Sequence, residues 1–88
     1  MSAKPAAKEL LVSARAPFHI YYEGPALVVS AANNVGKFDI LPGHADFFSI
    51  INPGEVVIET NADNVVNIPI SGGIIGVRND RVLLFVNM

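Results

Sequence analysis

His44 and the carboxylates near it are the residues whose types and spacing could support acid–base chemistry. A histidine can act as a general base when a carboxylate, here Asp39 or Asp46, orients its ring. That chemistry also needs a nucleophile, and none has a suitable setting. We therefore interpret the segment Gly36–Ala45 (GKFDILPGHA) as a structural turn or a contact loop, and not as a catalytic site.

The two serines that could serve as nucleophiles lie in unsuitable sequence contexts. Ser49 falls inside an apolar run typical of a strand, and Ser71 lacks the Gly-x-Ser-x-Gly pattern of a nucleophile elbow. The segment Ser71-Gly72-Gly73 also lacks the Lys-Ser/Thr and the following helix of a phosphate-binding loop. Two glycines between β-runs indicate a bend or a bulge where the chain crosses from one sheet to another.

Charge and composition exclude several classes of binding site. The sequence has six basic and eight acidic side chains, a net charge of −2 and no basic cluster, which argues against nucleic-acid binding. It has no cysteine, and its two histidines, His19 and His44, lie far apart without metal-ligand spacing. We expect no metal and no cofactor. The longest apolar runs, such as Val82–Val86, are far below the ~20 residues of a membrane helix, so any membrane association should occur through other proteins.

The pattern of elements predicts an all-β protein. With 88 residues the chain is long enough for one domain, which we place at residues 10–88 after a flexible lead-in over residues 1–9. Val- and Ile-rich runs are separated by turn residues such as Gly24-Pro25, Asn52-Pro53-Gly54 and Asn79-Asp80. The spacing predicts a two-sheet antiparallel β-sandwich. The expected strands are Leu10–Arg15, Phe18–Tyr22, Ala26–Ala32, Lys37–Leu41, Phe47–Ile51, Glu55–Thr60, Val65–Ser71, Ile74–Arg78 and Arg81–Asn87.

Alternation along these strands predicts the core and also a docking face. In Arg81–Asn87 both faces of the strand are apolar, and Ile74-Ile75 and Val56–Ile58 behave similarly. So small a domain has little material to cover both faces of a sheet, so we expect one face to dock onto another chain. The residues expected in the core are Val12, Val29, Ile40, Ile50, Val66, Ile68, Leu84 and Val86.

Taken in order, the motifs resemble the N-terminal domain of the F-type ATP synthase epsilon subunit family. That family has an aromatic-x-Gly turn, matched here by Tyr22-Glu23-Gly24, and an S-G-G signature, matched by Ser71-Gly72-Gly73. Its K-P-G turn corresponds to Asn52-Pro53-Gly54. Its G-E-x-G-I-L-P-G-H-A pattern is matched by Gly36, Ile40, Leu41, Pro42, Gly43, His44 and Ala45. The resemblance covers about residues 10–88.

The resemblance implies a rotor-stalk subunit with no catalytic residue of its own. Such a subunit couples rotation of the membrane-embedded c ring to the catalytic head through the gamma subunit, at the cytoplasmic face of a bacterial inner membrane. We expect an exposed apolar patch to bind gamma, formed by Val57, Ile75, Leu83 and Phe85. We expect an edge formed by Lys37, Asp39 and His44 to meet the c ring.

The sequence departs from the family pattern in three ways. Lys37 stands where the family usually has an acid, and Asp39 replaces the second glycine of the same pattern. The family continues into two C-terminal helices, whereas this sequence ends at Met88, so we expect no C-terminal helical hairpin. These departures leave a second hypothesis open, a stand-alone epsilon-like β-sandwich interaction module outside any synthase.

Overall fold

Short runs of β-branched residues separated by turn residues form nine strands in the part of the chain that the structure describes. The structure is a computed structural model that describes residues 9–61 and 63–87. Within these ranges it contains no helix, so none could span a membrane. The predicted lead-in, apart from Glu9, lies outside the described residues. The strands are β1 (Leu10–Ala16), β2 (His19–Ala26), β3 (Val28–Asn33), β4 (Gly36–Ile40), β5 (Phe47–Ile51), β6 (Gly54–Asn61), β7 (Asn64–Ile70), β8 (Gly72–Arg78) and β9 (Arg81–Asn87).

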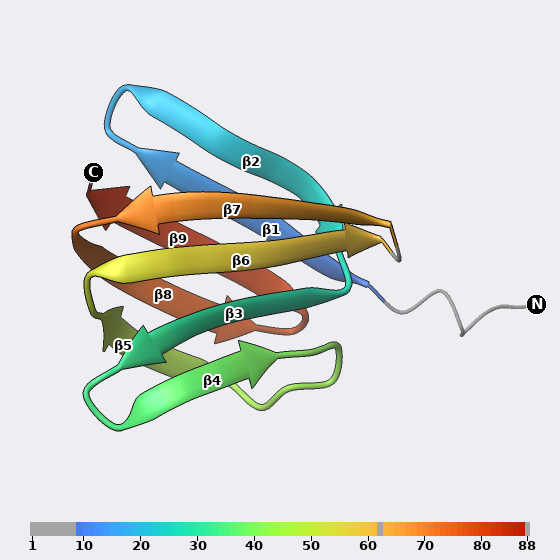
Figure 1. Ribbon diagram of the computed structural model, residues 1–88. Helices are drawn as coiled ribbons and strands as arrows, with labels where there is room; N and C mark the ends of the chain where they lie inside the picture. The colour runs from blue at the N-terminus through green and yellow to red at the C-terminus, as the bar shows by residue number, and fades with distance from the viewer. Residues whose placement is uncertain (1–8, 62, 88) are drawn as a thin grey trace, which may run out of the picture.

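The strands form two sheets packed face to face, which confirms the predicted sandwich (Figure 1). The five-stranded sheet has the order β2-β1-β9-β8-β5, and the four-stranded sheet has the order β4-β3-β6-β7. All pairs are antiparallel except β1 with β9, which are parallel. The predicted antiparallel sandwich thus contains one parallel pair. No hairpin joins the first strand to the last, so the packing of the whole chain sets their relative direction.

The core lies between the two sheets. Every second side chain of a strand points inward, and these inward-facing side chains form the core. Six of the eight residues expected in the core are buried, namely Val12, Val29, Ile40, Ile68, Leu84 and Val86. Val66 is half-buried and packs against this core. The prediction for Ile50 is wrong, because its side chain is 70% exposed.

The orientation of β5 explains the error at Ile50. The segment FFSII has apolar residues in both alternating sets, so either orientation would bury an isoleucine. The Phe47 ring packs against the Phe38 ring of β4 at 5.1 Å between centroids, and Asn33 Nδ2 donates to Ser49 Oγ at 3.1 Å. These contacts turn Phe47, Ser49 and Ile51 toward the four-stranded sheet and leave Ile50 outside.

The chain changes sheets after β2, and one predicted turn is displaced by this crossing. Gly24-Pro25 was predicted to form a turn but lies inside β2. The chain crosses to the other sheet after Ala26. A proline is tolerated there because β2 is an edge strand, whose outer side needs no backbone donor. Across the crossing, the Leu27 N–H donates to the Glu59 carbonyl of β6 at 2.7 Å.

The two ends of the sandwich carry different turns (Figure 1). We call one the Asp80 end: it carries the Asn79-Asp80 turn, the 41–46 loop after β4 and the start of β1. We call the other the Phe18 end: it carries the Pro17-Phe18 turn, the Asn34-Val35 turn and the end of β9. They lie at the right and left of Figure 1, respectively.

Candidate docking surface

The outer face of the five-stranded sheet is largely apolar, and we call six of its exposed hydrophobic side chains the apolar face. They come from four adjacent strands, and their exposed fractions range from 41% to 73%. A solvent-facing sheet surface normally alternates to polar residues, so a continuous apolar surface of this kind marks a binding site. The apolar face consists of Leu11, Phe48, Ile50, Ile74, Leu83 and Phe85.

Strand register aligns most of these side chains in rows across the sheet. Ile50 of β5 lies opposite Ile74 of β8, and Ile74 lies opposite Phe85 of β9. This continuous row of three exposed apolar side chains forms one half of the apolar face. Because side chains opposite one another in adjacent strands are in contact range, the row presents one surface to a partner.

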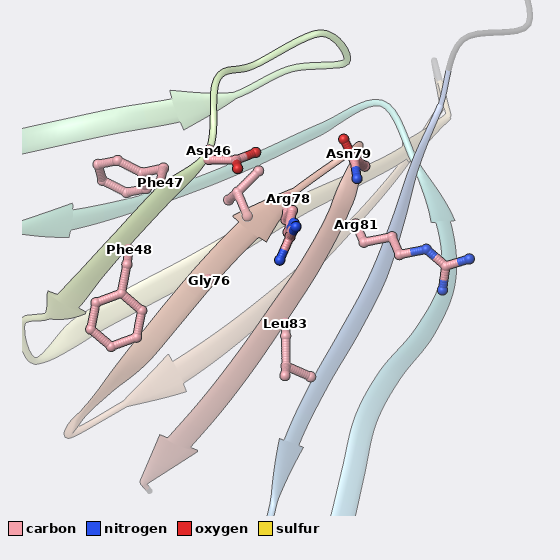
Figure 2. A pocket seen from close by; sticks show the side chains of 9 residues that line it. Asp46, Phe47, Phe48, Gly76, Arg78, Asn79, Arg81 and Leu83 are labelled. Atoms are coloured by element: carbon pink, nitrogen blue, oxygen red, sulfur yellow. The ribbon is translucent and has the colours of Figure 1, made fainter.

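The neighbouring row has a gap at its centre. Gly76 of β8 lies between Phe48 of β5 and Leu83 of β9. The absent side chain contributes to an open hollow of about 620 Å³, whose walls include Phe48 and Leu83. Figure 2 shows Phe48 and Leu83 on either side of Gly76, with Arg78 nearer the Asp80 end.

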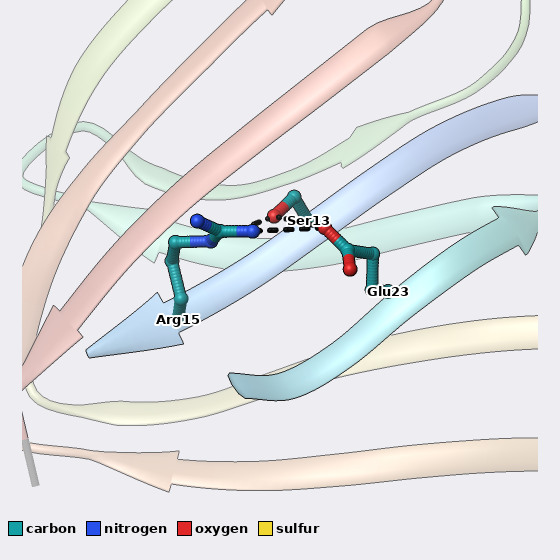
Figure 3. A network of polar contacts seen from close by, with 3 residues as sticks. All are labelled: Ser13, Arg15 and Glu23. Carbon is teal, nitrogen blue, oxygen red and sulfur yellow. Dashed lines mark hydrogen bonds and ion pairs between the residues drawn. The ribbon is translucent and has the colours of Figure 1, made fainter. Parts of the chain in front are cut away.

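A polar network bounds the apolar face on the side of β1 and β2 (Figure 3). Arg15 Nη2 lies 2.8 Å from Glu23 Oε2, and Arg15 Nε donates to Ser13 Oγ at 3.0 Å. The side chains of Arg15 and Glu23 are 38% and 56% exposed, so this pair contributes only about 0–1 kcal/mol to stability. It forms a polar rim beside the apolar face.

The outer face of the four-stranded sheet is different in character. Its residues include Lys37 and Asp39 of β4 and Glu55 and Glu59 of β6, all exposed. Ser30 Oγ donates to Asp39 Oδ1 at 2.6 Å across β3 and β4. The two outer faces therefore differ, one apolar and the other polar with an excess of carboxylates.

The four residues predicted to form one gamma-binding patch lie in three different places in the structure. Leu83 and Phe85 belong to the apolar face. The expected exposure of Ile75 is wrong, because its side chain is fully buried in the core. Val57 is half-buried and lies on β6 of the other sheet, so the expected single patch is also wrong.

Four members of the apolar face were not predicted from the sequence: Leu11, Phe48, Ile50 and Ile74. Each is adjacent in sequence to a buried or half-buried apolar residue, as with Ile74 beside Ile75 and Phe48 beside Phe47. The doubled apolar pairs signalled that one residue of each pair would be outside. They could not indicate which one, because the inward side of a strand is set by the elements that pack on it.

The three residues predicted to form a ring-contacting edge are also divided. Lys37 lies near the start of β4, next to the Asn34-Val35 turn at the Phe18 end. His44 lies beyond the other end of β4, in the 41–46 loop at the Asp80 end. Asp39 lies between them on β4 and is exposed. All three lie on the edge strand β4 or in the loop that follows it, as expected for an edge of the sandwich, but Lys37 and His44 lie at opposite ends of that edge. Their contact with a ring stays a prediction.

His44 has structural contacts and no catalytic partner in the described part of the chain. Its N–H donates to the Leu41 carbonyl at 3.1 Å, which closes a turn, and Nδ1 lies 2.7 Å from the Ala45 carbonyl. Its ring packs against Phe47 at 5.7 Å between centroids. No hydrogen bond or ion pair joins it to Asp39 or Asp46, and no metal-binding group of three acidic, histidine or cysteine residues was found among the described residues.

Ser71-Gly72-Gly73 has the structural role expected for it. It marks the crossing from β7 in the four-stranded sheet to β8 in the five-stranded sheet. A Cβ atom on Gly73 would lie 2.3 Å from the Phe85 carbonyl oxygen, closer than real side chains approach backbone. The close approach of β8 and β9 therefore requires glycine at this position.

The model of the family described as ATP synthase, Delta/Epsilon chain, beta-sandwich domain matches residues 9–88. The ATP synthase epsilon chain of Vesicomyosocius okutanii is 42% identical over 64 residues, which are 73% of this chain and 46% of that protein. The epsilon chain of Brevibacillus brevis is 30% identical over 76 residues, which are 86% of this chain and 58% of that protein. The chain thus spans about half the length of these curated relatives.

Two solved structures share the fold. The mitochondrial ATP synthase of Euglena gracilis (OSCP/F1/c-ring) contains a chain that matches 92% of this one over 52% of its own length, with a TM-score of 0.85 and 18% identity. The central stalk and c-ring of the Tetrahymena thermophila mitochondrial ATP synthase contain a chain that matches 90% of this one over 63% of its own length, with a TM-score of 0.76 and 19% identity. At this level of identity the likeness extends to the fold.

Proposed function

Because the chain belongs to the Delta/Epsilon chain β-sandwich family of ATP synthase, we propose that it is an epsilon-type rotor-stalk subunit of an F-type proton-translocating ATP synthase. In this role it couples rotation of the c ring to the catalytic head through gamma and carries out no catalysis itself. Residues 10–88 act as one domain. The subunit associates with a membrane only through the complex, at the cytoplasmic face of a bacterial inner membrane.

The apolar face is the observation that supports this function best. A rotor subunit must hold gamma firmly enough to transmit torque, and the apolar face offers six exposed hydrophobic side chains on one sheet. We propose that gamma binds there, with Leu83 and Phe85 at the centre and Phe48, Ile50 and Ile74 beside them. The polar outer face of the other sheet makes no contact with gamma in this arrangement.

The Phe18 end of the sandwich is the better candidate for contact with the c ring. Lys37 and the exposed turn tips Phe18 and Val35 lie there, and Asp39 lies further along the same strand. Lys37 and Asp39 remain our proposed ring-contacting residues. His44, at the Asp80 end, instead belongs with the loop that closes the other end of the sandwich.

Reconstitution tests the proposed function directly. The chain should bind an F1 head that carries gamma and lacks its own epsilon subunit, and the resulting complex should join c-ring vesicles from the same organism. Proton-driven ATP synthesis should then exceed that of the head without the chain. A chain that binds neither gamma nor the ring would instead be the stand-alone interaction module.

A further inference from the structure

Gly76 occupies an unusual place for a glycine, in the interior of β8 near the centre of the apolar face. Glycine weakens a strand interior because it adds conformational freedom and contributes no side chain to packing. A glycine in such a place commonly allows close approach by another group. The approaching group can come from this chain or from a partner.

The fold itself does not need glycine at this position. Gly76 is not among the residues with positive φ, so its backbone conformation is open to any residue. A Cβ atom there would meet only Phe48 Cδ1, at an ordinary contact distance of 3.9 Å. Gly73 on the same strand is the opposite case, since its own neighbour Phe85 excludes a side chain.

We propose that the hollow over Gly76 receives an apolar side chain of gamma, with Phe48 and Leu83 as its walls. This inference rests on the proposed function and adds the mode of binding. Gly76 leaves open the position that a side chain of this chain would otherwise fill, so a partner side chain can reach the sheet backbone. A group packed in such a desolvated pocket at the centre of an interface carries a large share of binding energy.

The charged side chains beside the hollow indicate which chemical group of gamma lies next to that apolar side chain. Arg78 and Arg81 lie directly opposite each other on β8 and β9, and like charges in this arrangement destabilise a sheet. Neither forms an ion pair within residues 9–61 and 63–87, whereas Arg15 is paired with Glu23. Asp46 also lines the hollow but is not paired with either arginine.

Both arginines line the hollow, but Figure 2 shows the Arg78 side chain beside it, whereas the Arg81 side chain runs away from it across β1. We therefore assign the rim contact to Arg78, with Arg81 adding to the local positive potential. The partner segment carries a carboxylate next to its apolar side chain. An arginine guanidinium can bind such a carboxylate through two parallel hydrogen bonds.

The test measures binding of single variants to an F1 head that carries gamma and lacks epsilon, by titration calorimetry. Gly76→Leu fills the hollow and should weaken binding by about tenfold or more while the chain remains folded. The matched control, Asn67→Leu, adds the same side chain to the outer face of the other sheet and should bind as the unmodified chain does. Arg78→Gln should weaken binding by about fivefold and reduce its salt dependence.

The outcomes separate this inference from the function on which it rests. If the unmodified chain binds the head and Gly76→Leu binds equally well, the hollow is not occupied and the inference is overturned, while the proposed function stands. If Gly76→Leu weakens binding but Arg78→Gln changes neither affinity nor salt dependence, the carboxylate part is overturned. If the unmodified chain does not bind, both proposals fail.

Discussion

The Asp80 carboxylate accepts a hydrogen bond from the Gly43 N–H, with 2.7 Å between Oδ1 and the nitrogen. This contact joins the 41–46 loop to the β8–β9 turn, 37 residues further along the chain. Gly43 has a φ of +87°, a conformation that favours glycine, and the Asp80 carbonyl also accepts the Leu11 N–H at 2.9 Å. Asp80 thus fastens three segments at one end of the sandwich.

Replacing Asp80 tests this fastening. Asp80→Ala removes the acceptor and places alanine at a φ of +61°, where aspartate and asparagine are better tolerated. We expect the free energy of unfolding to fall by about 1–2 kcal/mol in urea denaturation. Asp80→Asn keeps an acceptor oxygen and the tolerated conformation, so it should stay within about 0.5 kcal/mol of the unmodified chain. Equal stabilities for Asp80→Ala and the unmodified chain would show that the contact contributes nothing.

The two glycines of β8 should respond in opposite ways to alanine. Gly73→Ala forces a Cβ atom against the Phe85 carbonyl, so we expect a loss of about 3 kcal/mol or failure to fold. Gly76→Ala makes only one ordinary contact, with the Phe48 ring, and should leave stability unchanged or raise it by about 0.5–1 kcal/mol. Thermal and urea unfolding of both variants gives the comparison. Similar losses at both positions would mean that β8 and β9 do not approach as closely as described.

Adjacent leucines of β9 test which face of the strand is inside. Leu84 is fully buried, so Leu84→Ala should cost about 2–5 kcal/mol through lost burial and the cavity left behind. Leu83 is 44% exposed, and Leu83→Ala should cost about 1 kcal/mol or less. Urea denaturation of the two variants should separate them clearly. The reverse order of stabilities would overturn the assigned orientation of β9.

Phe85 tests the apolar face as the surface that binds gamma. Phe85→Asp should leave the fold intact and weaken binding to a gamma-containing head by about 2 kcal/mol or more, as for a central anchor. Val65→Asp is the matched control, because Val65 is also exposed, at 56%, but lies on β7 of the other sheet. Affinity can be measured by calorimetry. Equal losses from both variants would point to a general effect of the added charge.

Lys37 tests the contact with the c ring. Lys37 is exposed near the Phe18 end, so Lys37→Glu should change affinity by only about 0–1 kcal/mol. Its expected effect is poorer coupling with the native ring, measured as ATP synthesis per proton translocated in reconstituted vesicles. Improved coupling would mean that the native ring meets this position with basic groups.

Local sequence alone determined the elements and identified six of the buried core residues. In β7 the buried Ile68 and Ile70 alternate with the exposed Asn67 and Pro69, and period-two alternation with turn chemistry is a property of neighbouring residues. The nine expected strands therefore all occur. The glycines of Ser71-Gly72-Gly73 likewise marked the crossing between the sheets, because their conformational freedom is intrinsic.

Only the tertiary structure decided which side of the doubly apolar strands is outside. In the pairs Ile50-Ile51 and Ile74-Ile75, the local sequence allows either residue to face inward. In β5 the buried side is selected by contacts with distant residues such as Phe38. The parallel pairing of β1 with β9 and the separation of Lys37 from His44 are likewise relations between segments far apart in the sequence. A strand's own residues set its period, but the energy that selects the buried face comes from the elements that pack against it.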